Sequence, residues 1–214
     1  MKEYIVKNIG KHLFNTNGQR NLEIWNKAHV LTDFLSPWPI NKTVENIEFR
    51  ALTNNKTLCC QFKVFDTNIH IDKSEIILDS INNSDRVELF FRNSPSLNPY
   101  YCLEIDPSTR IMDFMAKPNK QFDFNWIWSK TNIKVKSYIL PDYFTVEIAL
   151  DLLYLKTLNV LKGNKIETGI YRAKYHEQQN GTFKPEWITW VNPNTKTPNF
   201  HTPSSFGILR LESF

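Results

Sequence analysis

The sequence has few cysteines, and their spacing does not suggest a disulfide framework. Only three of its 214 residues are cysteines, Cys59, Cys60 and Cys102. Neighbours on a strand point to opposite faces, so Cys59 and Cys60 do not suggest a simple mutual disulfide. An odd count without repeated spacing also argues against a disulfide-rich fold and against a zinc site. We therefore expect three small core residues in a protein of a reducing compartment.

Long apolar runs and clusters of basic residues are also missing. The N-terminus lacks the uninterrupted apolar segment of a secretory signal, and no stretch approaches the length of a membrane span. This predicts a soluble, cytoplasmic protein, or a secreted or periplasmic one if a leader has been removed. The 26 basic and 22 acidic residues give a net charge of +4, but Lys and Arg form no stripe. We expect neither a nucleic acid nor a membrane as partner.

Aromatic residues, by contrast, are abundant. There are fifteen Phe, eight Tyr and six Trp, which make up 14% of the chain. Such a load suits an all-β protein, and it also suits surfaces on which sugars or bases stack. The length fits one domain with a sizeable core, and no linker divides the chain. We predict a single domain over residues 1–214.

Alternation of apolar and polar residues predicts strands along most of the chain. The expected strands cover residues 48–52, 57–65, 85–91, 100–106, 109–115, 133–139, 144–150, 166–175, 187–191 and 208–211. A short helix over 21–28 and a Leu-rich helix over 150–161 interrupt the series. About ten short strands separated by turn signals predict an all-β protein, an antiparallel β-sandwich or barrel with one or two short helices.

The most informative pair of strands is 85–91 (DRVELFF) and 100–106 (YYCLEID). A register that buries their odd-numbered residues together also puts Glu88 and Glu104 on one face. If the two residues lie directly opposite each other, their Cβ atoms are only about 5 Å apart. Two carboxylates that close repel unless a cation or a shared proton intervenes. This pair is the first candidate for a functional site.

The carboxylate pair needs a counter-charge, and Arg172 is the expected source. Arg172 lies on a predicted strand with alternating side chains, and Ile170, two residues before it, points to the same face. A planar guanidinium can bind a carboxylate and still present donors to a hydroxyl group. The alternative is a purely structural ion pair across the sheet. Both readings can hold, because a fixed ion pair is a preorganised binding surface.

Four aspartates lie between residues 66 and 85, and a structural calcium ion is one explanation for them. Hard cations take several oxygen ligands, but the spacing of Asp66, Asp72, Asp79 and Asp85 matches no EF-hand loop. The alternative is a set of solvated loop acids. The histidines show no metal-ligand spacing, so we expect no other cofactor.

Several segments together resemble the carbohydrate-binding family 9-like proteins, relatives of the family 9 modules attached to some xylanases. The segments are residues 85–91, 100–107, 143–150, 169–174, 190–193 and 200–209. Their order and spacing are similar to the family's from about residue 20 to the C-terminus. The resemblance implies an antiparallel, immunoglobulin-like β-sandwich that binds a mono- or oligosaccharide without catalysis.

The resemblance also implies roles for individual residues. Glu88 matches the family's acidic residue in the Asp-x-Val-Glu strand, and Arg172 falls where the family carries a hydrogen-bonding side chain. Phe200 falls at a stacking aromatic, and Trp190 matches a further family position. At the other stacking position, where the characterised modules carry a tryptophan, this chain has residues 81–83 (INN).

His201 follows Phe200 directly, and its imidazole can donate and accept hydrogen bonds near neutral pH. The predicted carbohydrate-binding residues are therefore Glu88, Glu104, Arg172, Trp190, Phe200 and His201. Trp187 and Trp190 face opposite ways on a strand, so at most one of them can be a sugar platform.

Two other functions remain open. A glycoside-acting enzyme could use Glu88 and Glu104, because retaining enzymes hold their carboxyl groups about 5–5.5 Å apart. An arginine held between both would keep them ionised, however, and spoil the role of the acid. The other alternative is a partner-binding β-sandwich with a decayed sugar site. The missing stacking tryptophan favours it, and the retained charged residues oppose it.

Overall fold

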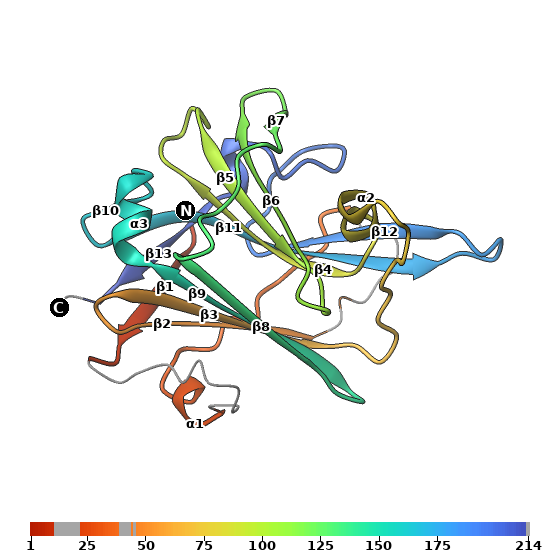
Figure 1. The fold of residues 1–214 in the computed structure, drawn as a ribbon, viewed down its shortest axis with the longest axis horizontal. Helices are drawn as coiled ribbons and strands as arrows, with labels where there is room; N and C mark the ends of the chain where they lie inside the picture. The colour runs from red at the N-terminus through yellow and green to blue at the C-terminus, as the bar shows by residue number, and fades with distance from the viewer. Residues whose placement is uncertain (11–21, 39–43, 45, 213–214) are drawn as a thin grey trace.

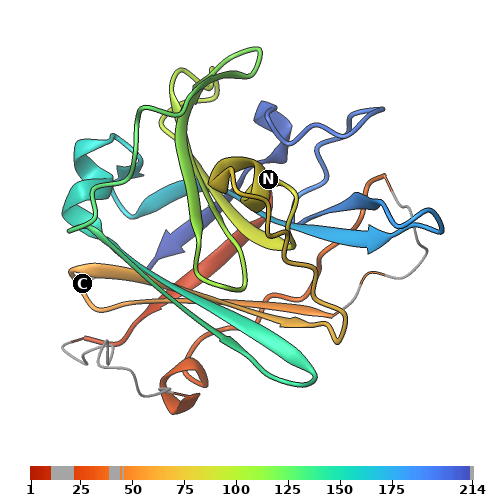
Figure 2. The ribbon, with the colours of Figure 1, turned by 45° about the vertical axis from the view of Figure 1, so that its right-hand side comes forward.

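The chain folds into two layers of strands packed face to face (Figures 1 and 2). The computed structural model describes residues 1–10, 22–38, 44 and 46–212. One layer contains, in spatial order, β7 (Gln121–Asp123), β6 (Ile111–Lys117), β5 (Tyr100–Ile105), β4 (Arg86–Arg92), β11 (Lys165–Glu177) and β13 (Gly207–Leu211), with β10 (Leu161–Lys162) and β12 (Phe183–Thr189) paired to β11. The other contains β2 (Ile47–Thr53), β3 (Thr57–Phe65), β9 (Tyr143–Asp151) and β8 (Ile133–Ile139).

β1 (Glu3–Asn8) joins the two layers into one curled sheet. Its first part pairs with β13 and its last two residues pair with β2, both in parallel, whereas the other strand pairs are antiparallel. The prediction of an all-β sandwich is confirmed. β1 was not predicted, because Glu3 and Lys7 make its sequence look polar. Only Tyr4 and Val6 face the core.

The main core lies between the two layers. β4 contributes Val87, Leu89 and Phe91, which meet Phe62 of β3 and Val146 of β9 within one buried cluster. The alternation that marked these strands in the sequence is therefore the alternation between the core and the outer faces. The strand predicted over 133–139 coincides with β8.

Helices are short and few among the described residues. They are α1 (Leu22–Trp25), α2 (Ile77–Asn82), α3 (Leu152–Thr157) and a 3-10 turn (Pro203–Ser205). α3 is shorter than the predicted helix over 150–161 because β9 continues to Asp151, whose side chain accepts a hydrogen bond of 2.8 Å from the amide of Tyr154 and caps the helix. No described helix is long and apolar enough to cross a membrane.

All three cysteines are buried free thiols, as predicted. Cys60 packs in the main core, whereas its neighbour Cys59 packs on the opposite face with Trp25 of α1. Cys102 lies on the outer face of the first layer, in a second cluster with Phe90. That outer face carries the site described next.

Candidate functional site

The floor of the site is a row of side chains across the outer face of the first layer. Glu88 of β4 lies directly opposite Glu104 of β5, and Glu104 lies opposite Met112 of β6. On the other side of β4, Tyr171 of β11 lies opposite Glu88. The predicted juxtaposition of Glu88 and Glu104 on one face is therefore present in the structure.

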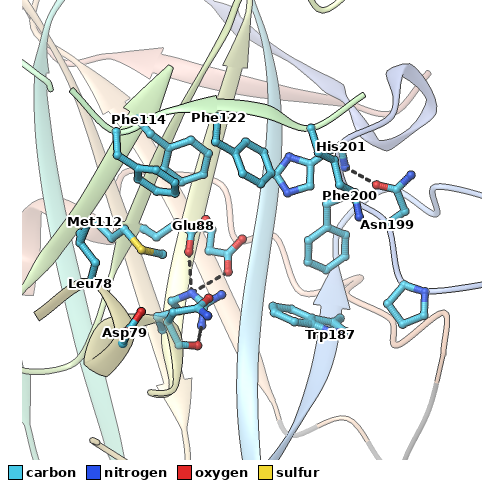
Figure 3. Close-up of a pocket in the computed structure, with 16 residues that line it drawn as sticks. Leu78, Asp79, Glu88, Met112, Phe114, Phe122, Trp187, Asn199, Phe200 and His201 are labelled. Carbon is cyan, nitrogen blue, oxygen red and sulfur yellow. Dashed lines mark hydrogen bonds and ion pairs between the residues drawn. The ribbon is translucent and has the colours of Figure 1, made fainter. Parts of the chain in front are cut away.

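Arg86 holds the two carboxyl groups together (Figure 3). Its Nε lies 3.0 Å from Oε1 of Glu88 and 2.7 Å from Oε2 of Glu104. Its Nη1 donates a hydrogen bond of 2.7 Å to the carbonyl of Asn82, at the end of α2. Arg86 precedes Glu88 by two residues and so shares its face, a spacing that the sequence already contains.

Arg172 is not the counter-charge of this pair, and the register explains why. It lies opposite Val87, whose side chain faces the main core, so Arg172 points to the interior as well. There its Nη2 forms an ion pair with Asp66 and lies 3.9 Å from Asp85. The expectation that Arg172 neutralises Glu88 and Glu104 is thus corrected to Arg86.

The same interior cluster accounts for two of the aspartates considered as calcium ligands. Lys174 Nζ lies 2.8 Å from Asp66 and 3.1 Å from Asp85, so these carboxylates have cations of the chain itself as partners. Burial would raise the pKa of Asp66, but Arg172 and Lys174 outweigh burial and lower it. In the described part of the chain, no group of three or more His, Cys, Asp or Glu side chains could hold a metal ion.

Burial dominates the electrostatics of the Glu88–Glu104 pair. It raises the pKa of Glu88 to about 8, with a further contribution from the neighbouring Glu104, and Arg86 only partly opposes the shift. Burial raises the pKa of Glu104 as well. The pair therefore keeps a proton at neutral pH, and the expectation that an arginine would hold both groups ionised is not met.

Aromatic rings form one wall above this floor. Trp187 of β12 lies opposite Ala173 of β11, and Ala173 lies opposite Arg86 of β4. The indole of Trp187 therefore stands over the guanidinium of Arg86, with Cζ of Arg86 5.4 Å from the centroid of the indole ring. Phe200 meets Trp187 edge to face at 5.6 Å and stacks on Tyr171 at 4.2 Å. Because Phe200 is only 6% exposed, the half-buried Trp187 offers the more open ring.

His201 continues this wall as a neutral group. Its Nδ1 lies 2.8 Å from the hydroxyl of Tyr100, and its ring centroid lies 4.9 Å from that of Phe122. Burial, with a smaller effect from Lys120, lowers the pKa of His201 to about 3. Figure 3 shows His201 between Phe200 and Phe122.

Together these residues line a cavity of about 400 Å³. It is lined by four predicted residues, Glu88, Glu104, Phe200 and His201, and by residues that the sequence interpretation did not select, namely Leu78, Asp79, Asn82, Arg86, Met112, Phe114, Lys120, Phe122, Phe124, Trp187, Pro198 and Asn199. α2 supplies Asn82, which belongs to the segment 81–83 where the stacking tryptophan expected from the resemblance is absent. Trp187 was missed because only Trp190 matched a family position.

Trp190 does not reach the cavity. It packs in the main core, where its ring covers Gly207 so closely that a Cβ at Gly207 would lie 2.4 Å from ring carbon Cζ3. Arg172 also lies outside the cavity. The structure therefore brings four of the six predicted site residues together and places Arg172 and Trp190 on the interior side of the sheet.

Gly169 sets the position of the aromatic wall, and Gly169→Ala should disturb it. A Cβ at Gly169 would lie 2.5 Å or less from ring atoms of Tyr171, the ring on which Phe200 stacks. We expect the substitution to lower the free energy of unfolding by about 1–3 kcal/mol in chemical denaturation. In a Tyr171→Ala background the added methyl should cost much less. Equal costs in both backgrounds would contradict the collision.

Comparisons with known proteins agree with this architecture. The model of the family described as carbohydrate family 9 binding domain-like matches residues 17–213. A family 9 carbohydrate-binding module from Caldicellulosiruptor kristjanssonii in complex with glucose is 15% identical, with a TM-score of 0.65 over 100% of this chain and 97% of that one. Its cellotriose complex gives 15% identity and a TM-score of 0.63, covering 100% and 95%. A candidate carbohydrate-binding protein from Bacteroides uniformis is 15% identical to this chain, with a TM-score of 0.69 over 99% of each chain. No curated protein matches the chain.

Proposed function

Because the chain belongs to the carbohydrate family 9 binding domain-like family, we propose that its cavity binds a mono- or oligosaccharide without cleaving it. The observation that carries the proposal is the combination of a charged floor with an aromatic wall. A pyranose ring has polar hydroxyls at its edge and an apolar face of C–H groups. The Glu88–Arg86–Glu104 cluster suits the hydroxyls, and the ring of Trp187 suits the apolar face.

The floor is preorganised for hydroxyl recognition. Glu88 and Glu104 are 2% and 4% exposed and are held by one guanidinium, so binding requires little ordering of these side chains. A carboxyl pair that keeps one proton offers both a donor and acceptors. His201, which is neutral, adds a further hydrogen-bonding group at the wall.

The arrangement of the carboxyl groups favours binding over glycoside cleavage. Glycosidases place their two carboxyl groups on either side of the scissile bond. Here both groups meet the same Nε of Arg86 and belong to one floor, so they face a ligand from the same side. We therefore propose no catalytic residue in this chain. Hydrolysis of aryl glycosides by the wild type, lost in Glu88→Gln, would favour the enzymatic alternative instead.

Trp187→Ala should weaken sugar binding at least tenfold, because it removes the half-buried ring that stands over the guanidinium of Arg86. Calorimetry with glucose and cellotriose, the sugars present in the solved relatives, measures the change. Phe183→Ala is a suitable control, since Phe183 belongs to the same strand β12 and is exposed but does not line the cavity.

Equal affinities of the wild type and Trp187→Ala would show that the sugar does not stack on this wall. A folded wild-type protein that binds no sugar in a broad glycan screen would overturn the proposal. That result would favour a partner-binding β-sandwich in which the sugar site has decayed.

A further inference from the structure

The two sides of the cavity differ in chemistry. In Figure 3, Trp187 and Phe200 lie on one side of Glu88, whereas Leu78, Met112 and Phe114 lie on the other. The first side combines aromatic faces with the charged floor. The second side is apolar and partly aliphatic.

The apolar side continues outward to the rim of the cavity. Of the eleven large hydrophobic side chains that are exposed in the described part of the chain, six come from two short segments, residues 76–78 and 122–127. Three of the six line the cavity, namely Leu78 at 43% exposure, Phe122 at 38% and Phe124 at 44%. Single exposed hydrophobics are ordinary, but a group of them beside a cavity marks a binding surface.

These residues are packed as one surface. Phe114, which is buried, contacts both Phe122 and Phe124, with ring centroids 5.1 and 4.9 Å away. Met112, from the same strand as Phe114, extends the surface to Glu104 on the floor. The apolar side therefore begins directly beside the hydroxyl-binding floor.

We propose that the natural ligand is a sugar bearing an apolar substituent, an aryl, alkyl or acyl group, which lies along Leu78, Met112 and Phe124 while the sugar ring occupies the side of Trp187. An aliphatic side chain such as Leu78 or Met112 presents no aromatic face on which a sugar can stack, but it contacts another apolar group well. The substituent would cover Leu78 and Phe124, which otherwise stay exposed to water, and this stabilises the complex. This inference rests on the proposed sugar-binding function.

Calorimetry with methyl β-glucoside and phenyl β-glucoside tests the inference, because the two ligands share the sugar and differ in the substituent. We expect the phenyl glucoside to bind the wild type about tenfold more tightly, as burial of one aromatic ring implies. In the double variant Leu78→Ala/Phe124→Ala the ratio of the two affinities should fall to about one. In Phe183→Ala, another exposed phenylalanine outside the cavity, the ratio should stay at its wild-type value.

The outcomes distinguish the proposed sugar site from the proposed apolar substituent of its ligand. Methyl glucoside binding with no preference for the phenyl glucoside overturns the apolar substituent and leaves the sugar site standing. Failure of both glucosides to bind overturns the glucoside-binding site and the substituent with it. A wild type that sediments as a dimer, and a double variant that sediments as a monomer with an unchanged ratio, would assign the apolar surface to self-association. Thermal unfolding of each variant establishes that it remains folded.

Discussion

Arg86→Met should lower the free energy of unfolding at pH 7 by about 3–5 kcal/mol, the cost of leaving buried charge without its partner. Arg86 is 3% exposed, and its Nε meets carboxyl oxygens of Glu88 and Glu104, which are buried as well. Methionine keeps much of the side-chain volume but supplies no charge. The variant also loses the hydrogen bond from Nη1 to the carbonyl of Asn82, which ties α2 to β4.

Two experiments distinguish the loss of charge neutralisation from a loss of side-chain packing as the cause of this destabilisation. If the cost comes from a buried carboxylate left without its cation, the triple variant Arg86→Met/Glu88→Gln/Glu104→Gln should recover much of the stability. The cost of Arg86→Met should also shrink as the pH falls, because the carboxylate that is still charged at pH 7 then takes up a proton, and burial favours its protonated form. Urea denaturation at pH 5 and pH 7 measures both effects.

Arg210→Met is the matched control for this experiment. Arg210 also pairs with a glutamate, Glu3, but the two side chains are 32% and 34% exposed. Exposed ion pairs are screened by solvent and contribute little, so the control should change stability little. A loss in Arg86→Met as small as the loss in Arg210→Met would show that the buried carboxyl pair does not depend on the guanidinium.

The sequence predicted the sandwich and two of the three residues of this charge cluster, Glu88 and Glu104, and the alternation of side chains along the strands explains both the success and the error. Alternation along 85–91 and 100–106 was enough to put Glu88 and Glu104 on one face, because a period of two leaves only two choices. The alternation of side chains within β11 does not show whether Arg172 lies on the face of Glu88 or on the opposite face. That depends on the register with β4, which pairs Arg172 with the core-facing Val87.

The same limit applies to the aromatic wall. Trp187 and Trp190 were known to face opposite ways, but sequence alone could not decide which one faces the core. The structure places Trp190 against Gly207 and leaves Trp187 beside Arg86. Phe122 and Leu78 come from β7 and α2, elements too short to carry a clear periodic signal.

The buried carboxyl pair should also make the stability of the fold depend on pH, and Glu88 is the residue to test. Its pKa is about 8 in the folded protein, against an ordinary value of 4.5, because burial and Glu104 disfavour its charged form. Between these two pH values the folded state holds a proton that the unfolded state has released. Stability contributed by this group is therefore complete below about pH 4.5 and declines as the pH rises toward 8.

Glu88→Gln should remove this decline, because the amide keeps the shape of the protonated acid and cannot ionise. We expect the variant to gain on the wild type as the pH rises from 5 to 8, reaching a few kcal/mol, since each pKa unit corresponds to about 1.4 kcal/mol. Denaturation curves of both proteins across this range give the difference directly. Glu3→Gln, on the exposed pair with Arg210, should keep the wild-type slope. A difference between wild type and Glu88→Gln that does not change with pH would mean that Glu88 is already ionised at pH 5, and that Arg86 outweighs burial after all.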